Sequence, residues 1–197
     1  MTGFEPFGGD LVNPSERIVR RLAADSLPGA VISTRVLPVA YRRAFAPLAE
    51  ALDTERFTGA LLMGLRAGRG TLDFERFGVN WRGSAGPDND GLRIEGEPID
   101  PAGPAAYFAT LNVQDLVAAC HGAGAPAAVS SHAGTFLCNQ VLYQTLRHCD
   151  RHDLATRAGF VHLPLLPEQA TKGEPAVAEE AMFAAIRAVL TVLVRGV

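Results

Sequence analysis

Residues 131–140 combine a cysteine with the local sequence that activates one. Gly134 permits a tight turn and Thr135 is a candidate N-cap, so we expect a helix whose first turn carries Cys138. Unpaired N–H groups and the positive dipole end at a helix start stabilise an anion, which predicts a lowered pKa for the Cys138 thiol. The same N–H groups can hold a developing oxyanion. Cys138 is therefore a candidate nucleophile.

A cysteine nucleophile needs a base, and the base needs a group that orients it. His162 lies near the end of an apolar, strand-like run that stops at Pro164. Glu75 lies upstream, in a strand-like run over residues 72–81. Ligands of open α/β sheets bind outside the carboxyl ends of the strands, so these three side chains are expected to meet there. The sequence thus predicts a nucleophile, base and carboxylate set: Cys138, His162 and Glu75.

The segments around these residues alternate between strand-like and helix-like patterns, which is typical of α/β proteins. We expect strands at residues 31–39, 60–63, 72–81, 127–130 and 159–163, and helices at 14–22, 41–52, 112–119, 138–146 and 174–195. Few residues precede the glycine-containing turn at Gly3, so the first strand is either very short or lacks residues before it. The expected fold is one domain over residues 1–197, an α/β/α sandwich with a mixed, mostly parallel central sheet.

Composition and charge exclude several classes of protein. The chain has 197 residues, a net charge of −3 and a pI near 5.9, with no basic run to bind nucleic acid. The three cysteines, Cys120, Cys138 and Cys149, show no disulfide pattern and indicate a reducing compartment. No signal sequence or bilayer-spanning apolar run is present, so we expect a cytoplasmic protein without a membrane partner.

Two further patterns fit ordinary structure better than a ligand site. His148 and His152 are spaced for a metal, with Cys149 between them, but charged flanks mark a solvated helix end and no motif adds a third ligand. The glycine-rich loops at residues 3–9 and 64–70 lack the P-loop lysine and the dinucleotide fingerprint. We therefore expect no metal and no cofactor.

Three separated motifs, in this order, resemble the pyroglutamyl peptidase I family of cysteine exopeptidases. The first is TGFEPFGG at residues 2–9 followed by NPS at 13–15, and the second spans residues 64–80 and includes Glu75. The third pairs AGTFLCN at residues 133–139 with GFVHLP at 159–164. Each motif alone is modest, but the three together cover nearly the whole chain.

The resemblance implies a cytosolic enzyme, commonly a homotetramer, that removes N-terminal pyroglutamyl residues from small blocked peptides without a cofactor. It implies that Cys138 is the nucleophile, His162 the general base and acid, and Glu75 the carboxylate that orients the histidine. It also implies a neutral, apolar slot for the lactam ring. The residues implied for this slot are Phe4, Phe7, Val39, Phe136 and Leu137.

This chain departs from the family pattern at two places. Arg66 adds bulk and charge where relatives often have alanine, and Ala85-Gly86 stands where relatives often have Arg-Ile near the substrate. These departures leave two alternatives open: a catalytically silent protein that binds pyroglutamyl termini, and a cysteine amidohydrolase acting on another small lactam. In the enzyme interpretations, a thiol with a lowered pKa is expected to react with alkylating agents before the other two cysteines.

Overall fold

The structure is a computed structural model that describes residues 1–84 and 86–195. The strands, in chain order, are β1 (Thr2–Phe4), β2 (Arg35–Leu37), β3 (Gly59–Leu65), β4 (Leu72–Glu75), β5 (Phe77–Val79), β6 (Ala106–Phe108), β7 (Ala127–Ser130) and β8 (Arg157–Leu163). The helices are α1 (Pro14–Ala23), α2 (Ala46–Thr54), α3 (Val113–Gly122), α4 (Leu137–Arg151) and α5 (Glu179–Arg195).

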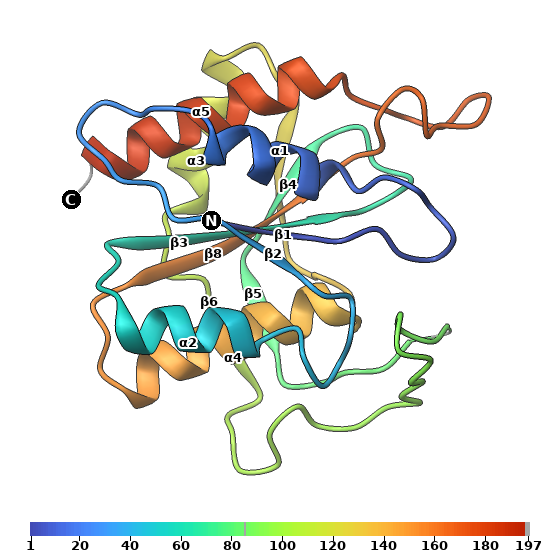
Figure 1. The fold of residues 1–197 in the computed structure, drawn as a ribbon, viewed down its shortest axis with the longest axis vertical. Coiled ribbons are helices and arrows are strands. Elements are labelled where there is room, and N and C mark those ends of the chain that lie inside the picture. Colours follow the sequence, from blue (N-terminus) through green and yellow to red (C-terminus); the bar gives the residue numbers. More distant parts are fainter. Residues whose placement is uncertain (85, 196–197) are drawn as a thin grey trace.

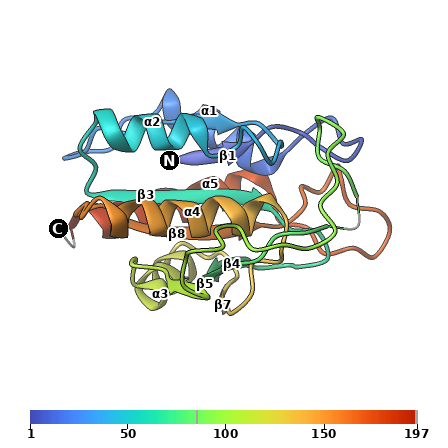
Figure 2. The ribbon, with the colours of Figure 1, turned by 90° about the horizontal axis from the view of Figure 1, so that it is seen from below.

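One sheet, in the order β2-β1-β3-β8-β4-β7, separates two layers of helices in the described part of the chain. Helices α1, α3 and α5 cover one face, and α2 and α4 cover the other (Figure 1; Figure 2 shows the same layers from below). Neighbouring strands are parallel except for β4 and β8, which are antiparallel. The predicted α/β/α sandwich with a mixed, mostly parallel sheet is confirmed.

Each face of the sheet has its own apolar core, because successive strand residues point to opposite faces. On β8, Val161 and Leu163 pack into the core under α1, α3 and α5. Phe160 joins the core under α2 and α4 instead. His162 therefore points, with Phe160, toward the layer that contains α4.

Local sequence explains where several helices begin. The side chain of Asn13 accepts a hydrogen bond from the Ser15 N–H and caps α1, with Pro14 as the first helical residue. Asn112 caps α3 through the Gln114 N–H in the same way. Both starts agree with the sequence prediction.

Other boundaries differ because long-range pairing overrides local propensity. The last helix begins at Glu179, not at residue 174, because the Val177 N–H donates to the Leu165 carbonyl and holds the preceding chain extended. The strand expected over residues 72–81 divides at Arg76 into β4 in the main sheet and β5, which pairs with β6 in a separate ribbon. The helix expected from residue 41 starts at Ala46, after a turn.

Every helix in the described residues is too short or too polar to cross a lipid bilayer.

Candidate active site

Cys138 lies in the first turn of α4, where the sequence placed it. Gly134 has a φ of +77°, which lets the chain turn between β7 and the helix. The N-cap is Phe136, however, and not Thr135 as predicted. The Thr135 hydroxyl instead donates to the Gly83 carbonyl oxygen at 2.7 Å, so it ties the turn to a distant loop.

The environment of the Cys138 thiol differs from the sequence expectation. Burial raises its pKa from 9.0 to about 12, and the negative charge of Glu75 acts in the same direction. The backbone N–H of Cys138 and the charge of Arg66 lower the pKa, but they do not outweigh burial. The expected lowering of the pKa was wrong because the thiol at this helix start is largely shielded from water by apolar side chains. Cys138 therefore holds its proton at neutral pH until a base removes it.

His162 and Glu75 form a buried pair behind the cysteine. The His162 Nδ1 atom lies 2.7 Å from Glu75 Oε1, and the two residues are 4% and 0% exposed. A carboxylate only accepts hydrogen bonds, so Nδ1 carries the proton and Nε2 is left as the basic nitrogen. The Phe160 ring packs against the imidazole at a centroid distance of 4.8 Å. The pair fixes both the tautomer and the orientation of the ring.

Glu75 reaches His162 by a route that the sequence did not predict. Strand β4 runs antiparallel to β8, so its carboxyl end does not lie beside the carboxyl end of β8. Glu75 pairs with Phe160, and its side chain spans the diagonal to the residue two positions further along β8. Glu75 and His162 meet as expected. They do so because they are diagonal neighbours on two antiparallel strands, and not because the carboxyl ends of two parallel strands lie side by side.

Gly64 lies beside both the nucleophile and the base. In the register of β3 and β8 it stands opposite His162. A Cβ atom placed on Gly64 would lie 2.7 Å from Cys138 Sγ and 2.9 Å from the Phe160 ring. The sulfur thus packs directly against the bare backbone of the strand beside His162, and only glycine leaves space for it.

These residues open onto a cavity of about 210 Å³. Cys138 and His162 line it, while Glu75 lies behind His162. The residues expected to form an apolar slot all line it as well: Phe4, Phe7, Val39, Phe136 and Leu137. Sequence analysis did not assign the remaining lining residues, which are Asn13, Leu65, Arg66, Ala133 and Gly134. The volume is smaller than that of most drug-sized sites and suits one small ring.

The aromatic wall of the cavity, formed by Phe7 and Phe136, is supported by residues outside the cavity. Phe136 packs edge-on against Tyr41 at 5.4 Å and lies 6.0 Å from the Phe7 ring. The Tyr41 N–H donates to the buried carboxylate of Asp88 at 2.8 Å. Asn89, the next residue, donates to Glu5 Oε1 and to the Pro6 carbonyl. The loop that contains Asp88 and Asn89 therefore fixes both sides of the wall.

Two buried amides follow the cysteine and were missed from the sequence. Asn139 exchanges hydrogen bonds with the backbone of Val79 and also donates to the Trp81 carbonyl. Gln140 accepts from Arg82 Nη1 and donates to the Tyr41 carbonyl. Consecutive amides at the start of an apolar helix were the available signal, since buried amides need partners.

Of the two departures from the family pattern, one lies in the site. Arg66 lines the cavity, and its Nη1 lies 3.4 Å from Glu75 Oε1. Ala85 lies outside the described residues. Gly86 is exposed, accepts a hydrogen bond from the Ser84 hydroxyl, and is not among the lining residues.

His148, near the end of α4, and His152, the residue just after it, make contacts typical of a helix end. His148 Nε2 lies 2.8 Å from Asp53 Oδ1, and the His148 and His152 rings stack at 4.4 Å. Across residues 1–84 and 86–195, no group of three histidine, cysteine or acidic residues is placed to hold a metal ion.

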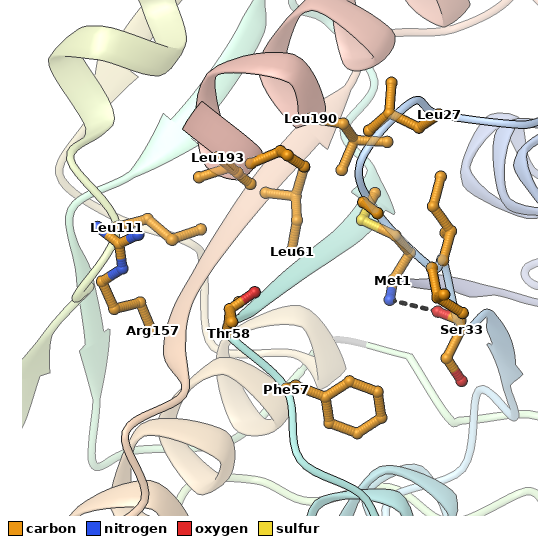
Figure 3. A pocket seen from close by; sticks show the side chains of 15 residues that line it. Met1, Leu27, Ser33, Phe57, Thr58, Leu61, Leu111, Arg157, Leu190 and Leu193 are labelled. Atoms are coloured by element: carbon orange, nitrogen blue, oxygen red, sulfur yellow. Dashed lines mark hydrogen bonds between the residues drawn. The ribbon is translucent and has the colours of Figure 1, made fainter. Parts of the chain in front are cut away.

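A second cavity, of about 90 Å³, lies near the start of β3 (Figure 3). Apolar side chains such as Leu61, Leu111 and Leu190 line it, and the Met1 nitrogen donates to the Ser33 carbonyl at its edge. It contains neither a cysteine nor a histidine among its described lining residues. It therefore lacks the paired thiol and imidazole of the first cavity, although the Met1 amino group, whose pKa burial lowers to about 6, lies at its edge.

Comparison with known proteins identifies the family. The model of the pyroglutamyl peptidase family matches residues 1–196. Pyrrolidone-carboxylate peptidase of Pyrococcus furiosus is 41% identical over 169 residues, covering 86% of this chain and 81% of that protein. The Chromobacterium violaceum enzyme of the same name is 44% identical over 172 residues, covering 87% and 80%.

Solved structures agree with the sequence comparison. Pyrrolidone carboxyl peptidase from Fervidobacterium islandicum superposes with a TM-score of 0.93 at 37% identity, covering 98% of this chain and 95% of that one. Pyroglutamyl peptidase I from Bacillus amyloliquefaciens gives a TM-score of 0.94 at 34% identity, with the same coverage of 98% and 95%. The chain thus belongs to the pyroglutamyl peptidase family.

Proposed function

We propose that this protein is a cysteine exopeptidase that removes the N-terminal pyroglutamyl residue from small blocked peptides. The observation that carries the proposal is the small apolar cavity onto which both Cys138 and the His162–Glu75 pair open. Membership of the pyroglutamyl peptidase family supports the same reaction.

The reaction begins with the neutral thiol. His162 Nε2 accepts the proton of Cys138 as Sγ attacks the carbonyl carbon that joins pyroglutamate to the next residue. The carbonyl oxygen becomes an oxyanion, for which the backbone N–H of Cys138 is the nearest donor expected at the helix start. The intermediate collapses with cleavage of the C–N bond, and His162 returns its proton to the leaving amine. Water, activated by His162, then hydrolyses the thioester and restores the thiol.

Glu75 acts through His162. Its carboxylate holds the tautomer that leaves Nε2 basic, and it stabilises the imidazolium that forms when Nε2 takes the proton. Glu75 is fully buried, and its Oε2 has no hydrogen-bond partner among the described residues. A carboxylate so poorly solvated is stabilised strongly by a neighbouring positive charge, which favours proton transfer to His162.

The cavity explains selection of the lactam. Phe4, Phe7 and Phe136 offer apolar surfaces to a flat, neutral ring. An uncyclised N-terminal glutamate would bring an ammonium group into this slot, where none of the described lining residues is an aspartate or glutamate that could pair with it, and burying an unpaired charge is costly. Ordinary N-termini are therefore rejected.

Three further properties belong to the proposal. Residues 1–197 form a single catalytic domain, the active assembly is a homotetramer, and the protein works in the cytoplasm without a cofactor. The family resemblance supports the assembly and the location. Light scattering of the purified protein tests the tetramer.

The deciding experiment measures release of a fluorophore from an L-pyroglutamyl amide by the wild type and by Cys138→Ala. Release by the wild type alone supports both the reaction and the nucleophile. A folded wild type that binds pyroglutamyl peptides without turnover would be a silent binding protein. Activity on other lactams or amides only would indicate an amidohydrolase.

A further inference from the structure

Arg66 brings a positive charge to the edge of the cavity. It directly follows β3, and its N–H donates to the Leu163 carbonyl at 2.9 Å, which fixes its backbone at the end of β8. Its side chain is 36% exposed and lines the same cavity as Cys138. The backbone of Arg66 is therefore fixed, while its side chain is partly open to solvent.

The contacts of the guanidinium leave part of it available. Within the described residues its hydrogen bonds are all made by Nη1, to Glu75 Oε1 at 3.4 Å, the His132 carbonyl at 3.1 Å and Ser130 Oγ at 3.5 Å. A guanidinium carries five N–H donors, and those on Nε and Nη2 are not used by these contacts. Arg66 can accordingly hold its place through Nη1 and present the other donors to a ligand.

The lactam ring is neutral, so it offers no charge to pair with Arg66. Among the described residues that line the cavity, Arg66 alone has a permanent positive charge, and none is an aspartate or glutamate. Glu75 contacts Nη1 and offsets part of this charge, but it is fully buried and leaves the N–H groups on Nε and Nη2 for a ligand. These free N–H groups lie at the exposed edge of the cavity, where they can meet the part of the substrate that extends beyond the lactam ring.

We propose that Arg66 determines specificity for the leaving residue, favouring substrates that carry a carboxylate on the residue after pyroglutamate. This inference rests on the proposed function and names its preferred substrates. The carboxylate is either the free C-terminus of a pyroglutamyl dipeptide or an acidic side chain at that position. Guanidinium and carboxylate pair through two parallel N–H···O bonds, which fits the donors that Arg66 leaves free.

The test compares kcat/KM within two matched pairs of substrates. The first pair is pyroglutamyl-alanine with a free or an amidated C-terminus. The second is pyroglutamyl-glutamate amide with pyroglutamyl-glutamine amide. We expect the wild type to prefer the charged member of at least one pair by about three- to fivefold, as for a solvent-exposed ion pair. The pair that shows the preference identifies which carboxylate Arg66 meets.

Arg66→Met should bring the ratio to about one, and added salt should reduce it in the wild type. A general loss of activity through the contact with Glu75 cancels in the ratio. Arg56→Met is the matched control, since Arg56 is exposed just before β3, at the opposite end of that strand. Its removal changes the net charge equally and should leave the ratio unchanged.

A wild type without preference in either pair, or an equal preference in Arg66→Met, would overturn the inference. Binding of the same peptides to Cys138→Ala, with and without Arg66→Met, separates this failure from failure of the proposed function. A charge preference in binding that depends on Arg66, without turnover by the wild type, would keep this inference and refute the peptidase. Binding without such a preference would refute the role of Arg66 whatever the activity.

Discussion

The two cavities at opposite ends of β3 are both bounded mainly by apolar side chains, yet only one combines a thiol with an imidazole among its described lining residues. The cavity beyond Gly64 contains a thiol, an imidazole and a guanidinium. The cavity at Gly59 is bordered mainly by aliphatic groups and packs beneath α5 (Figure 3). Both cavities have a guanidinium among their lining residues, so the difference shows that a site is marked by a nucleophile beside an oriented base, and not by concavity or by polar groups alone.

The largest expected effect is loss of the nucleophile. Cys138→Ala should reduce kcat on a pyroglutamyl amide by about 10⁴-fold or more, since the covalent route is removed. Cys149→Ala, on the same helix but outside the cavity, should keep near wild-type activity. Circular dichroism checks that both variants fold. Substantial turnover by Cys138→Ala would show that the cavity at the Gly64 end of β3 does not owe its activity to this thiol.

Replacing Glu75 should be nearly as damaging. In Glu75→Gln the amide can donate to Nδ1, which favours the tautomer with the proton on Nε2 and removes the base. We expect kcat to fall by about 10³-fold with little change in KM, measured by steady-state kinetics. A large increase in KM with normal kcat would instead make Glu75 part of the binding site.

A methyl group at each end of β3 tests the two cavities directly. Gly64→Ala places a Cβ 2.7 Å from Cys138 Sγ, whereas at Gly59 the nearest atom is the Arg157 carbonyl oxygen at 3.7 Å, an ordinary contact. Displacing the sulfur should cost about 10²-fold in kcat/KM. Gly59→Ala should leave kcat/KM unchanged, and equal losses in the two variants would contradict the assignment.

Truncating the aromatic wall should weaken binding more than chemistry. Phe7→Ala removes a ring that faces the lactam slot, so we expect KM for a pyroglutamyl amide to rise about tenfold. Phe183→Ala is the control, because that ring packs on α5 under Arg21, 4.0 Å from its guanidinium carbon. A similar rise in KM for both variants would refute a pocket role for Phe7.

The smallest effect concerns alkaline pH. Burial raises the pKa of Cys138 from 9.0 to about 12, so the folded protein binds this proton more tightly than the unfolded chain. The resulting stability is present below pH 9.0 and is lost as pH rises toward about 12. Between about pH 8 and about pH 10, the wild type should lose more unfolding free energy than Cys138→Ala, by about 1 to 1.5 kcal/mol. Urea titrations of both proteins measure this difference, and parallel losses would contradict the raised pKa.

The sequence predicted those parts of the site that depend on residue type and local order. Cys138 after a glycine turn, His162 in a buried strand, and the aromatic residues of the first loop all line one cavity. The architecture followed from alternating patterns, since each element must bury one face.

The sequence did not predict features that depend on distant segments. The direction of β4, and with it the diagonal reach of Glu75, is set by strand pairing in three dimensions. The raised pKa of Cys138 arises from burial by several elements that no local motif reveals. Local propensity also placed the cap at Thr135, whose hydroxyl is used by Gly83 instead.

The amides beside the nucleophile have a consequence for how this enzyme can diversify. Asn139 accepts a hydrogen bond from the Val79 N–H at the end of β5, and Gln140 accepts one from Arg82. These bonds hold the first residues after β5 against the start of α4. Further along the connection that leads to β6, Asp88 and Asn89 support the residues around the cavity, whereas Gly86 is exposed and is not among the described residues that line it. Exposed positions of this connection such as Gly86 can therefore change while the two amides keep α4 and its cysteine in place.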